Sequence, residues 1–257
     1  MTVLDEAHTV VRSYSTTWYD PVVSMPPRLN EATTAAYLCM RAIDEIEDHP
    51  ALEGTVKATL LRDVSKLWQS RFTEGDFTAL LSSHDQLPEV TCRLGEWTAL
   101  APPDIAPRVL ETFATMAARM ADWAETDFAI HTEQDLNRYT YAVAGTLVLL
   151  LSDLWAWHDG TRTHRTHAIA YGRALQAVNI LIDRDTDTTR GVDFWPDHWQ
   201  RADLAAYCRA ELAQADLYLA ALPSGPARVF CERPLSMAHH ALGRASRSAA
   251  SRQGGRV

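Results

Sequence analysis

Apolar residues recur along most of this chain at spacings of three and four, the period of a helix with one buried face. Alternating apolar and polar runs, which are typical of strands, are nearly absent. Short clusters of Pro, Gly, Asp and Ser separate the periodic segments. The pattern predicts helices over residues 30–49, 55–72, 105–129, 135–157, 165–186, 201–221 and 234–246. We therefore expect an all-α protein.

The predicted helices follow one another without a flexible interdomain linker or a repeat of fixed period. With 257 residues, of which 47% are hydrophobic, the chain is long enough to bury a substantial core. We expect a single helical domain over residues 1–257. Its end, rich in Arg, Ser and Gly from about residue 243 to residue 257, is expected to be disordered.

A stripe of polar side chains runs along one of the most apolar predicted helices. Gln176, Asn179, Asp183 and Asp187 lie at positions i, i+3, i+7 and i+11, so they share one helix face. The neighbouring positions hold Ala, Val, Ile and Leu. Two aspartates four residues apart cost a helix about 0.2–0.5 kcal/mol, and burying them without a partner costs far more. The stripe therefore predicts a positively charged partner that the sequence itself does not supply.

A second stripe has matching offsets. Tyr37, Arg41, Asp44 and Asp48 lie at i, i+4, i+7 and i+11 in "AAYLCMRAIDEIEDH". Two helices, distant in sequence, thus each present a pair of aspartates one turn apart. If the pairs face each other across a cavity, their carboxylates suit Mg²⁺, which prefers oxygen ligands and completes its octahedron with water and phosphate oxygens. Such a metal would bridge the protein to a diphosphate and help that group leave.

Paired carboxylates also occur on solvated helix faces and in di-iron sites. Acidic pairs at i, i+4 are common on solvated helix faces, but the matching offsets and apolar surroundings favour a metal site. A di-iron bundle needs Glu-x-x-His on two helices, and no Glu here is followed by a His three residues later. Walker-type and dinucleotide-binding glycine loops are also absent from the sequence.

The net charge and the cysteines indicate which classes of partner and which cellular compartment to expect. A formal net charge of −9 argues against nucleic acid as a general partner. The four cysteines are scattered without zinc-site spacing, so we expect reduced core residues and a cytoplasmic protein. The start of the chain shows no export signal. The longest apolar run, over residues 143–151, is too short to span a bilayer, which leaves only peripheral membrane contact open.

Three stretches resemble motifs of the squalene and phytoene synthase family. The first aspartate-rich motif of that family, Asp-x-x-Glu-Asp, is matched by Asp44, Glu47 and Asp48. Its Tyr-containing Val-Ala-Gly motif is similar to "YTYAVAGTL" at Tyr139–Leu147. Its second aspartate motif, with the Phe-Trp-Pro of the squalene branch, resembles "GRALQAVNILIDRDTDTTRGVDFWP" at Gly172–Pro196. The likeness runs in order over most of residues 13–199.

The resemblance implies an all-α isoprenoid synthase fold, a single helical domain with a central cavity. It implies that Mg²⁺ is bound through Asp44, Asp48, Asp183 and Asp187. Members of the family join two prenyl diphosphates head to head through a cyclopropyl intermediate, which makes C15 or C20 prenyl diphosphate the expected substrate. The residues that the resemblance places around the diphosphates and the reacting carbons are Tyr37, Arg41, Tyr139, Gln176 and Asn179. The use of NADPH and the oligomeric state are left open.

Three positions depart from the family pattern, because each lacks an arginine that the family usually has. These positions hold Thr16, Ile182 and Val192. Other arginines lie close in sequence and are candidates to bind diphosphate in their place: Arg12, Arg184 and Arg190. A displaced guanidinium does not automatically keep the planar, two-pronged geometry that phosphate recognition uses. The site for a second diphosphate is therefore the part of the prediction most affected.

The sequence as a whole predicts a Mg²⁺-dependent prenyltransferase that couples two allylic prenyl diphosphates. The first alternative is a divergent relative that ionises one prenyl diphosphate and then cyclises it or transfers it to another acceptor. The second alternative is a non-catalytic partner subunit. The intact aspartates favour an enzyme, since a protein that only binds a partner has no need of four mutually repelling carboxylates.

Overall fold

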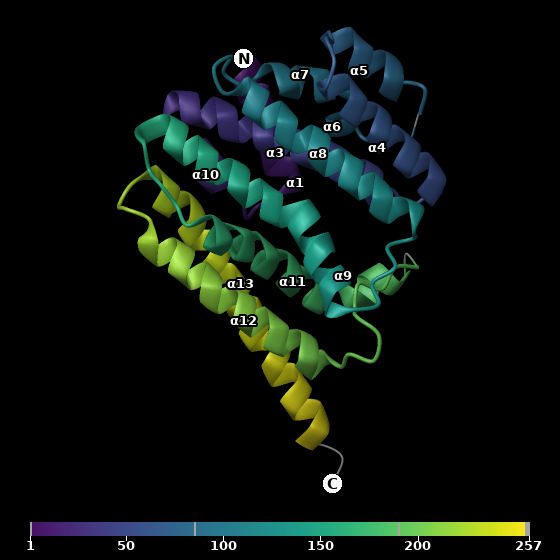
Figure 1. Cartoon of the computed structure of the whole chain (residues 1–257), viewed down its shortest axis with the longest axis vertical. Coiled ribbons are helices and arrows are strands. Elements are labelled where there is room, and N and C mark those ends of the chain that lie inside the picture. The colour runs from purple at the N-terminus through teal and green to yellow at the C-terminus, as the bar shows by residue number, and fades with distance from the viewer. Residues whose placement is uncertain (1, 85, 190, 255–257) are drawn as a thin grey trace. The chain divides into compact units, whose positions relative to one another are not determined.

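The computed structural model describes residues 2–84, 86–189 and 191–254, and within these ranges every regular element is a helix. This confirms the predicted all-α class (Figure 1). The chain forms two compact units. Unit 1 comprises Met1–Asp127 and Leu150–Arg162, and unit 2 comprises Phe128–Leu149 and Thr163–Val257. Organisation as one domain with a central cavity stays a prediction.

Unit 1 holds the first eight helices and most of the tenth. They are α1 Val3–Tyr14, α2 Tyr19–Val23, α3 Pro27–Glu47, α4 Gly54–Trp68, α5 Glu74–Leu81, α6 Glu89–Cys92, α7 Leu94–Ala99, α8 Ala106–Glu125 and α10 Thr146–Asp159. Unit 2 holds α9 Glu133–Thr140, the π-helix η1 Tyr141–Gly145, the first turn of α10, α11 Arg165–Thr189, α12 Arg201–Ala221 and α13 Pro226–Gly254.

The helix boundaries differ from expectation where local capping chemistry decides them. Helix α3 begins three residues early because Pro27 is its first residue, where a missing N–H costs nothing. Residues 73–76 contain Gly and Asp, which are typical of a turn, yet Thr73 and Asp76 form a capping box that starts α5. Helices α2, α6 and α7 were not predicted either, because at four to six residues they are too short for a helical period to show; α1, with 12 residues, was also not predicted. Helix α12 has the predicted bounds.

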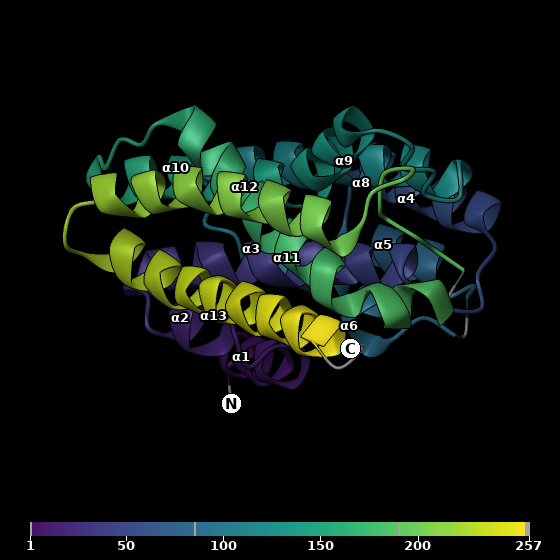
Figure 2. The same cartoon turned by 90° about the horizontal axis from the view of Figure 1, so that it is seen from below.

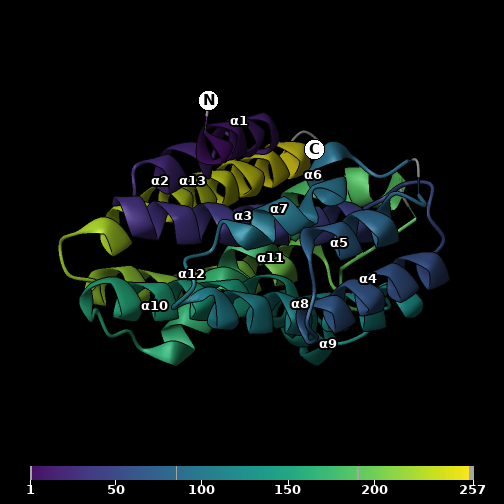
Figure 3. The same ribbon diagram turned by 90° about the horizontal axis from the view of Figure 1, so that it is seen from above.

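Helix α3 is the central helix of unit 1 and is buried on most of its circumference. Leu38, Ile43 and Ile46 are fully buried, and the four buried alanines of the same helix allow neighbouring helices to approach closely. Helices α6 and α7 lie against α3 (Figure 3), and the Thr91 hydroxyl donates to the Ala42 carbonyl over 3.0 Å. Helices α4 and α8 run side by side (Figure 1). The burial of α3 fixes the direction in which its polar stripe points.

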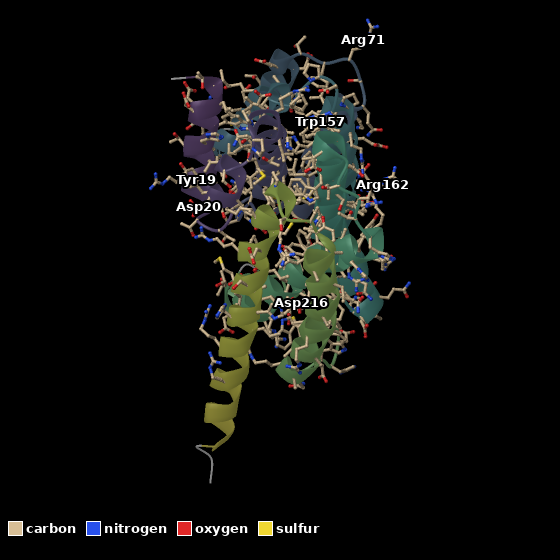
Figure 4. The ribbon with its side chains drawn as sticks, turned by 90° about the vertical axis from the view of Figure 1, so that its left-hand side faces the viewer. Tyr19, Asp20, Arg71, Trp157, Arg162 and Asp216 are labelled. Carbon is tan, nitrogen blue, oxygen red and sulfur yellow. The ribbon has the colours of Figure 1, made fainter. Side chains whose placement is uncertain are left out.

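Near the end of α10, Trp157 contacts two other residues of unit 1. The Trp157 indole N–H donates to Asp104 Oδ2 over 3.1 Å, and the Arg28 guanidinium lies 5.1 Å from the centre of the indole ring. Arg28 also pairs with Asp104 at 2.5 Å. Figure 4 labels Trp157 in unit 1, with Arg162 farther along the chain pointing away from the ribbon.

In unit 2, α11 packs against α12, α13 and η1, and α12 and α13 run side by side (Figure 2). The Tyr171 hydroxyl on α11 donates to the Cys231 carbonyl on α13 over 2.6 Å. Helices α12 and α13 are also joined at the surface by Asp216, labelled in Figure 4, which lies 2.9 Å from His239.

A polar network joins α9, α11 and α12 within unit 2. The Arg173 guanidinium donates to the Glu211 carboxylate over 2.8 Å and to the Tyr207 hydroxyl over 3.0 Å. Tyr207 in turn donates to Asn137 Oδ1 over 2.7 Å, and Arg173 contacts the same oxygen. Burial raises the pKa of the Glu211 carboxyl, although the charge of Arg173 opposes the rise. The network fixes the rotation of α11 and so the direction of its aspartates.

The π-helix η1 is the segment "YAVAG", which contains the Val-Ala-Gly motif. π-Helical turns are rare and often occur at functional sites. Helix α11 comes unusually near to this turn. A Cβ atom added to Gly172 would lie 2.4 Å from the Ala144 carbonyl oxygen and 2.8 Å from Gly145 Cα. Only glycine at position 172 allows this approach of two backbones.

The sequence also led to expectations about the tail, the cysteines and the longest apolar segment. The backbone of α13 is helical through Gly254, and disorder of the tail from about residue 243 stays a prediction. All four cysteines lie in the described ranges and none forms a disulfide; three are buried, and Cys92 is half-buried. The continuous helical run Glu133–Asp159 is long and apolar enough to cross a membrane by composition alone, a correction to the shorter run seen in the sequence. More than half of its most apolar window is buried, as in the core helix of a globular protein.

We predict that Gly172→Ala lowers the free energy of unfolding by about 1–3 kcal/mol, because the new methyl group meets backbone atoms that have no room to move. Equilibrium unfolding in urea measures the change. The control is Gly75→Ala in α5, where the added Cβ is 3.6 Å from its nearest neighbour. This variant should be stabilised by about 0.4–1 kcal/mol. Equal stability of the two variants would contradict the close approach of α11 and η1.

Candidate functional site

The first stripe lies on α3 as the sequence predicts. Tyr37 is buried, with 7% of its surface exposed, and Arg41, Asp44 and Asp48 are half-buried along the same face. Burial raises the pKa of Tyr37 to about 12. Its hydroxyl is therefore neutral throughout the physiological range and is available as a hydrogen-bond donor. Glu47 flanks the stripe and is 3% exposed, which is rare for a carboxylate.

Arg41 is clamped between two carboxylates and an aromatic ring. Its Nη1 donates to Asp44 Oδ2 over 2.7 Å, and its Nε donates to Glu45 Oε1 over 2.9 Å. Nη2 contacts the same Glu45 oxygen. The ring of Tyr14, at the end of α1, lies 5.2 Å from the guanidinium carbon. The arginine thus bridges α1 and the acidic end of α3.

The C-terminal end of α3 carries more negative charge than a helix end favours. Asp44, Glu45, Glu47 and the capping residue Asp48 lie in its last turns, and no basic residue is in the last turn. A helix C-terminus already has a partial negative charge, so each nearby carboxylate costs about 0.3–1 kcal/mol when nothing offsets it. The Arg41 guanidinium contacts two of these carboxylates, those of Asp44 and Glu45. The arrangement is suited to binding further cations.

The second stripe occupies the equivalent end of α11. Gln176 is half-buried, Asn179 and Asp183 are exposed, and Asp187 is 7% exposed. Again the last turn has no basic residue. The Asp187 carbonyl accepts a hydrogen bond of 3.1 Å from the Val192 N–H, which turns the chain at the end of the helix. Both aspartate pairs therefore sit at the negative ends of their helices.

The donor chemistry of the stripes fits Mg²⁺. Each pair offers hard carboxylate oxygens one helical turn apart, on a helix end that favours positive charge. In the described ranges, no group of three or more His, Cys, Asp or Glu side chains could by itself hold a metal ion. Mg²⁺ does not require one, because it usually takes one or two carboxylates and fills its remaining positions with water and substrate phosphate oxygens. Whether Asp44, Asp48, Asp183 and Asp187 share one cation cluster stays a prediction.

Tyr139 belongs to an aromatic cluster in unit 2. Its ring stacks on Phe194 with centroids 4.7 Å apart and planes 18° from parallel. Phe128 meets both rings edge-on, at 6.3 Å from Tyr139 and 5.7 Å from Phe194. Tyr139 is 3% exposed, so in this structure it packs as a core residue. The cluster ties α9 to the Phe-Trp-Pro segment that follows α11.

Arg184, a candidate for binding diphosphate, is engaged by the loop that follows α11. Its Nη2 donates to Asp193 Oδ2 over 2.6 Å, and its guanidinium carbon lies 3.9 Å from the centre of the Trp195 ring. The Trp195 indole N–H donates to the Ile180 carbonyl over 3.3 Å. Arg190, the second candidate, lies outside the described residues.

The structure shows how exposed the residues are that stand at the three positions without the usual arginines. Ile182 is 43% exposed, unusual for a large aliphatic side chain, and Val192 is half-buried. Thr16 is exposed in the connection between α1 and α2. Arg12, the third candidate substitute, lies with its guanidinium carbon 5.3 Å from the centre of the Tyr19 ring (labelled in Figure 4).

A sequence model of squalene/phytoene synthase matches residues 11–206, about three quarters of the chain. The match covers both aspartate stripes and the π-helical segment between them. This protein belongs to the squalene/phytoene synthase family. The family predicted from the motifs is thereby confirmed.

Relatives come from both branches of the squalene/phytoene synthase family. The chain is 28% identical over 214 residues to a squalene synthase of Eremothecium gossypii, which covers 77% of this chain and 47% of the relative. It is 30% identical over 208 residues to a 15-cis-phytoene synthase of Synechocystis, covering 75% and 56%. The chain thus spans about half the length of the curated relatives it matches.

Solved structures of family members establish the fold. A complex of the squalene synthase TcSQS with the ligand BPH1237 matches with a TM-score of 0.77 at 18% identity, covering 95% of this chain and 79% of the other. A dehydrosqualene synthase in complex with a ligand matches with a TM-score of 0.62 at 18% identity, covering 93% and 83%. The chain has the all-α isoprenoid synthase fold, as predicted.

Three residues that were not predicted from the sequence contact candidate site residues: Glu45 and Tyr14 contact Arg41 in unit 1, and Asp193 contacts Arg184 in unit 2. Glu45 lies four residues after Arg41, a spacing at which helix side chains of opposite charge commonly pair, so the sequence did contain its signal. The pairing of Tyr14 with Arg41 and of Asp193 with Arg184 depends on how α1 and the loop after α11 fold back. Neither contact has a local sequence signal.

We predict that Arg184→Ala loosens the loop Gly191–Trp195 and lowers the unfolding free energy by about 1 kcal/mol. The loss combines a half-exposed ion pair with a cation–π contact. Hydrogen exchange at the loop amides should accelerate. The control, Arg162→Ala, removes an exposed arginine of the other unit and should leave exchange in the loop unchanged. Unaltered loop exchange in Arg184→Ala would instead favour a role for Arg184 in binding substrate.

Proposed function

We propose that this protein is a Mg²⁺-dependent prenyltransferase that joins two allylic prenyl diphosphates of C15 or C20 head to head. The observation that carries the proposal is the pair of aspartate stripes at the negative ends of α3 and α11, in a chain that belongs to the squalene/phytoene synthase family. The similarity to a squalene synthase and to a 15-cis-phytoene synthase supports this proposal.

The proposed roles follow from the chemistry of each side chain. Asp44, Asp48, Asp183 and Asp187 would hold Mg²⁺. Mg²⁺, when bound, neutralises the diphosphate and stabilises it as a leaving group. Arg41 would donate N–H groups to diphosphate oxygens.

The remaining side chains would handle the substrate around its reacting carbons. The neutral Tyr37 hydroxyl and the amides of Gln176 and Asn179 would orient the substrate through hydrogen bonds. Loss of diphosphate leaves an allylic cation, which aromatic faces stabilise and which water would quench. Tyr139, whose ring stacks on Phe194, is the candidate for an aromatic wall.

A second candidate function is favoured by a specific observation at α11. Arg184 is paired with Asp193, and the positions that usually carry arginine hold Ile182 and Val192. A chain with fewer free cations there is better suited to ionise a single prenyl diphosphate, which it would then cyclise or transfer to another acceptor.

NADPH has no identifiable binding motif in the sequence, and its use stays open. A cytoplasmic location, proposed from the four unpaired cysteines, is tested by fractionating cells.

We predict that Asp44→Asn and Asp183→Asn each lower turnover at least about 100-fold while changing the unfolding free energy by less than about 1 kcal/mol. The reason is that each carboxylate is needed as a cation ligand but adds repulsion in the metal-free protein. The melting temperature should rise with Mg²⁺ plus diphosphate in the wild type, and less in both variants.

Asp185→Asn is the matched control for these variants. Asp185 lies on the same helix end but is turned by about 200° from Asp183, and it is exposed. This variant should keep both turnover and the ligand-induced rise in melting temperature. Full activity in Asp44→Asn and Asp183→Asn would remove the basis for the metal site.

We predict that incubation with C15 or C20 diphosphate yields C30 or C40 hydrocarbon, identified by mass spectrometry. Each charge-assisted hydrogen bond contributes about 1.5–3 kcal/mol, so three missing arginines must be compensated if two diphosphates bind. Arg184→Ala should then raise the Michaelis constant and impair coupling. Products of C10, C15 or C20 alone, at every substrate concentration, would identify a single-substrate enzyme instead.

A further inference from the structure

The guanidinium of Arg41 is held from three directions by residues of unit 1. Glu45 Oε1 accepts from both Nε and Nη2, along one edge of the planar group. Asp44 Oδ2 accepts from Nη1 over 2.7 Å. The ring of Tyr14 lies across one face, with its centre 5.2 Å from the guanidinium carbon. Three of the five N–H groups of Arg41 are thereby committed.

Glu45 and Asp44 do not have equivalent roles in this arrangement. Asp44 belongs to the aspartate pair proposed to bind cations, and Glu45, the next residue, is turned by about 100° around the helix. Both carboxylates compete for one guanidinium. Without Glu45, the charge of Arg41 would be balanced by Asp44 alone, and that carboxylate would be less available to a divalent cation. Glu45 therefore draws Arg41 partly away from the metal ligand.

Tyr14 contributes from a different helix. It lies in the last turn of α1, and its ring covers a guanidinium whose side chain is only 28% exposed. A cation over an aromatic face is attracted by the ring, and the attraction increases where water is excluded. The ring also limits the rotation of the long arginine side chain. Arg41 is thus restrained by an ion pair along one edge and a ring on one face.

We propose that Glu45 and Tyr14 are positioning residues that hold Arg41 beside the first aspartate pair, with its remaining N–H groups directed to a diphosphate. This inference rests on the proposed function. As far as the described residues go, one N–H on Nη1 and one on Nη2 remain for ligand oxygens. Two such donors from a planar group match two oxygens of a phosphate.

The test is a double-mutant cycle on the binding of inorganic diphosphate in the presence of Mg²⁺, measured by titration calorimetry. Glu45→Gln should weaken binding about tenfold in the wild-type background and less than about twofold in an Arg41→Met background. The direction of the change in affinity is informative, because removing the negative charge of Glu45 would by itself strengthen the binding of an anion. An equal effect of Glu45→Gln in both backgrounds would overturn the proposal.

Two controls separate positioning from general charge and packing effects. Glu89→Gln removes a carboxylate that also acts electrostatically on Tyr14 but is bonded to Arg93, so binding should not weaken. Tyr14→Phe keeps the aromatic face and should bind within about twofold of the wild type, whereas Tyr14→Leu should bind about three- to tenfold more weakly. If Tyr14→Phe and Tyr14→Leu bind alike, the ring has no positioning role.

The melting temperature of each variant without ligand shows whether it is folded. Should Glu45→Gln fail to fold, the two Tyr14 variants still decide the proposal. A wild-type protein that binds no diphosphate with Mg²⁺ contradicts the proposed function itself. A wild-type protein that binds it, with additive effects in the cycle, contradicts only the positioning by Glu45 and Tyr14.

Discussion

Helices α3 and α11 place aspartates where their own carbonyl dipoles already concentrate negative potential. Residues 44–48 put four carboxylates at the end of α3, and residues 183–187 put three at the end of α11. Helix propensity and the macrodipole both disfavour such placement. A fold retains this charge when a ligand offsets it, and divalent cations with an anionic substrate are the ligands whose charge and oxygen preference match. The proposed function therefore addresses an electrostatic cost that is visible in the protein itself.

Mutually repelling carboxylates keep their orientation only when the helices that carry them are held rigidly. In unit 1 the burial of α3 on most sides fixes the direction of its acidic stripe. In unit 2 the close approach of Gly172 to Ala144 and the bonds of Arg173 to α9 and α12 fix α11. The Val-Ala-Gly segment thus has a structural reason for its small residues. The π-helical turn and the flanking glycine allow two backbones to meet, and this contact sets the rotation of the helix that carries the second aspartate pair.

The sequence predicted those features that depend on periodicity and on motifs. The helical class, the bounds of α12 and the two aspartate stripes all follow from residues close in sequence. The sequence did not predict features that depend on local helix capping or on contacts between segments distant in the chain. The segment at Thr73 contains a turn signal that is also a capping box, and only the structure decides between them. Asp193 and Tyr14 reach their arginines through folding of a loop and of α1, so no spacing rule identifies them.

The departures from the family pattern near α11 are explained by helix geometry. Arg184 lies two residues beyond Ile182, and two residues correspond to about 200° of rotation. An arginine at position 184 therefore projects on nearly the opposite side of the helix from one at position 182. It pairs there with Asp193 and stacks on Trp195, so it stabilises the loop after α11. The positive charge thus lies on a different face of α11 from position 182. The face of position 182 carries an exposed aliphatic side chain. A change of this kind alters which anions that face of α11 attracts, without altering the helix itself.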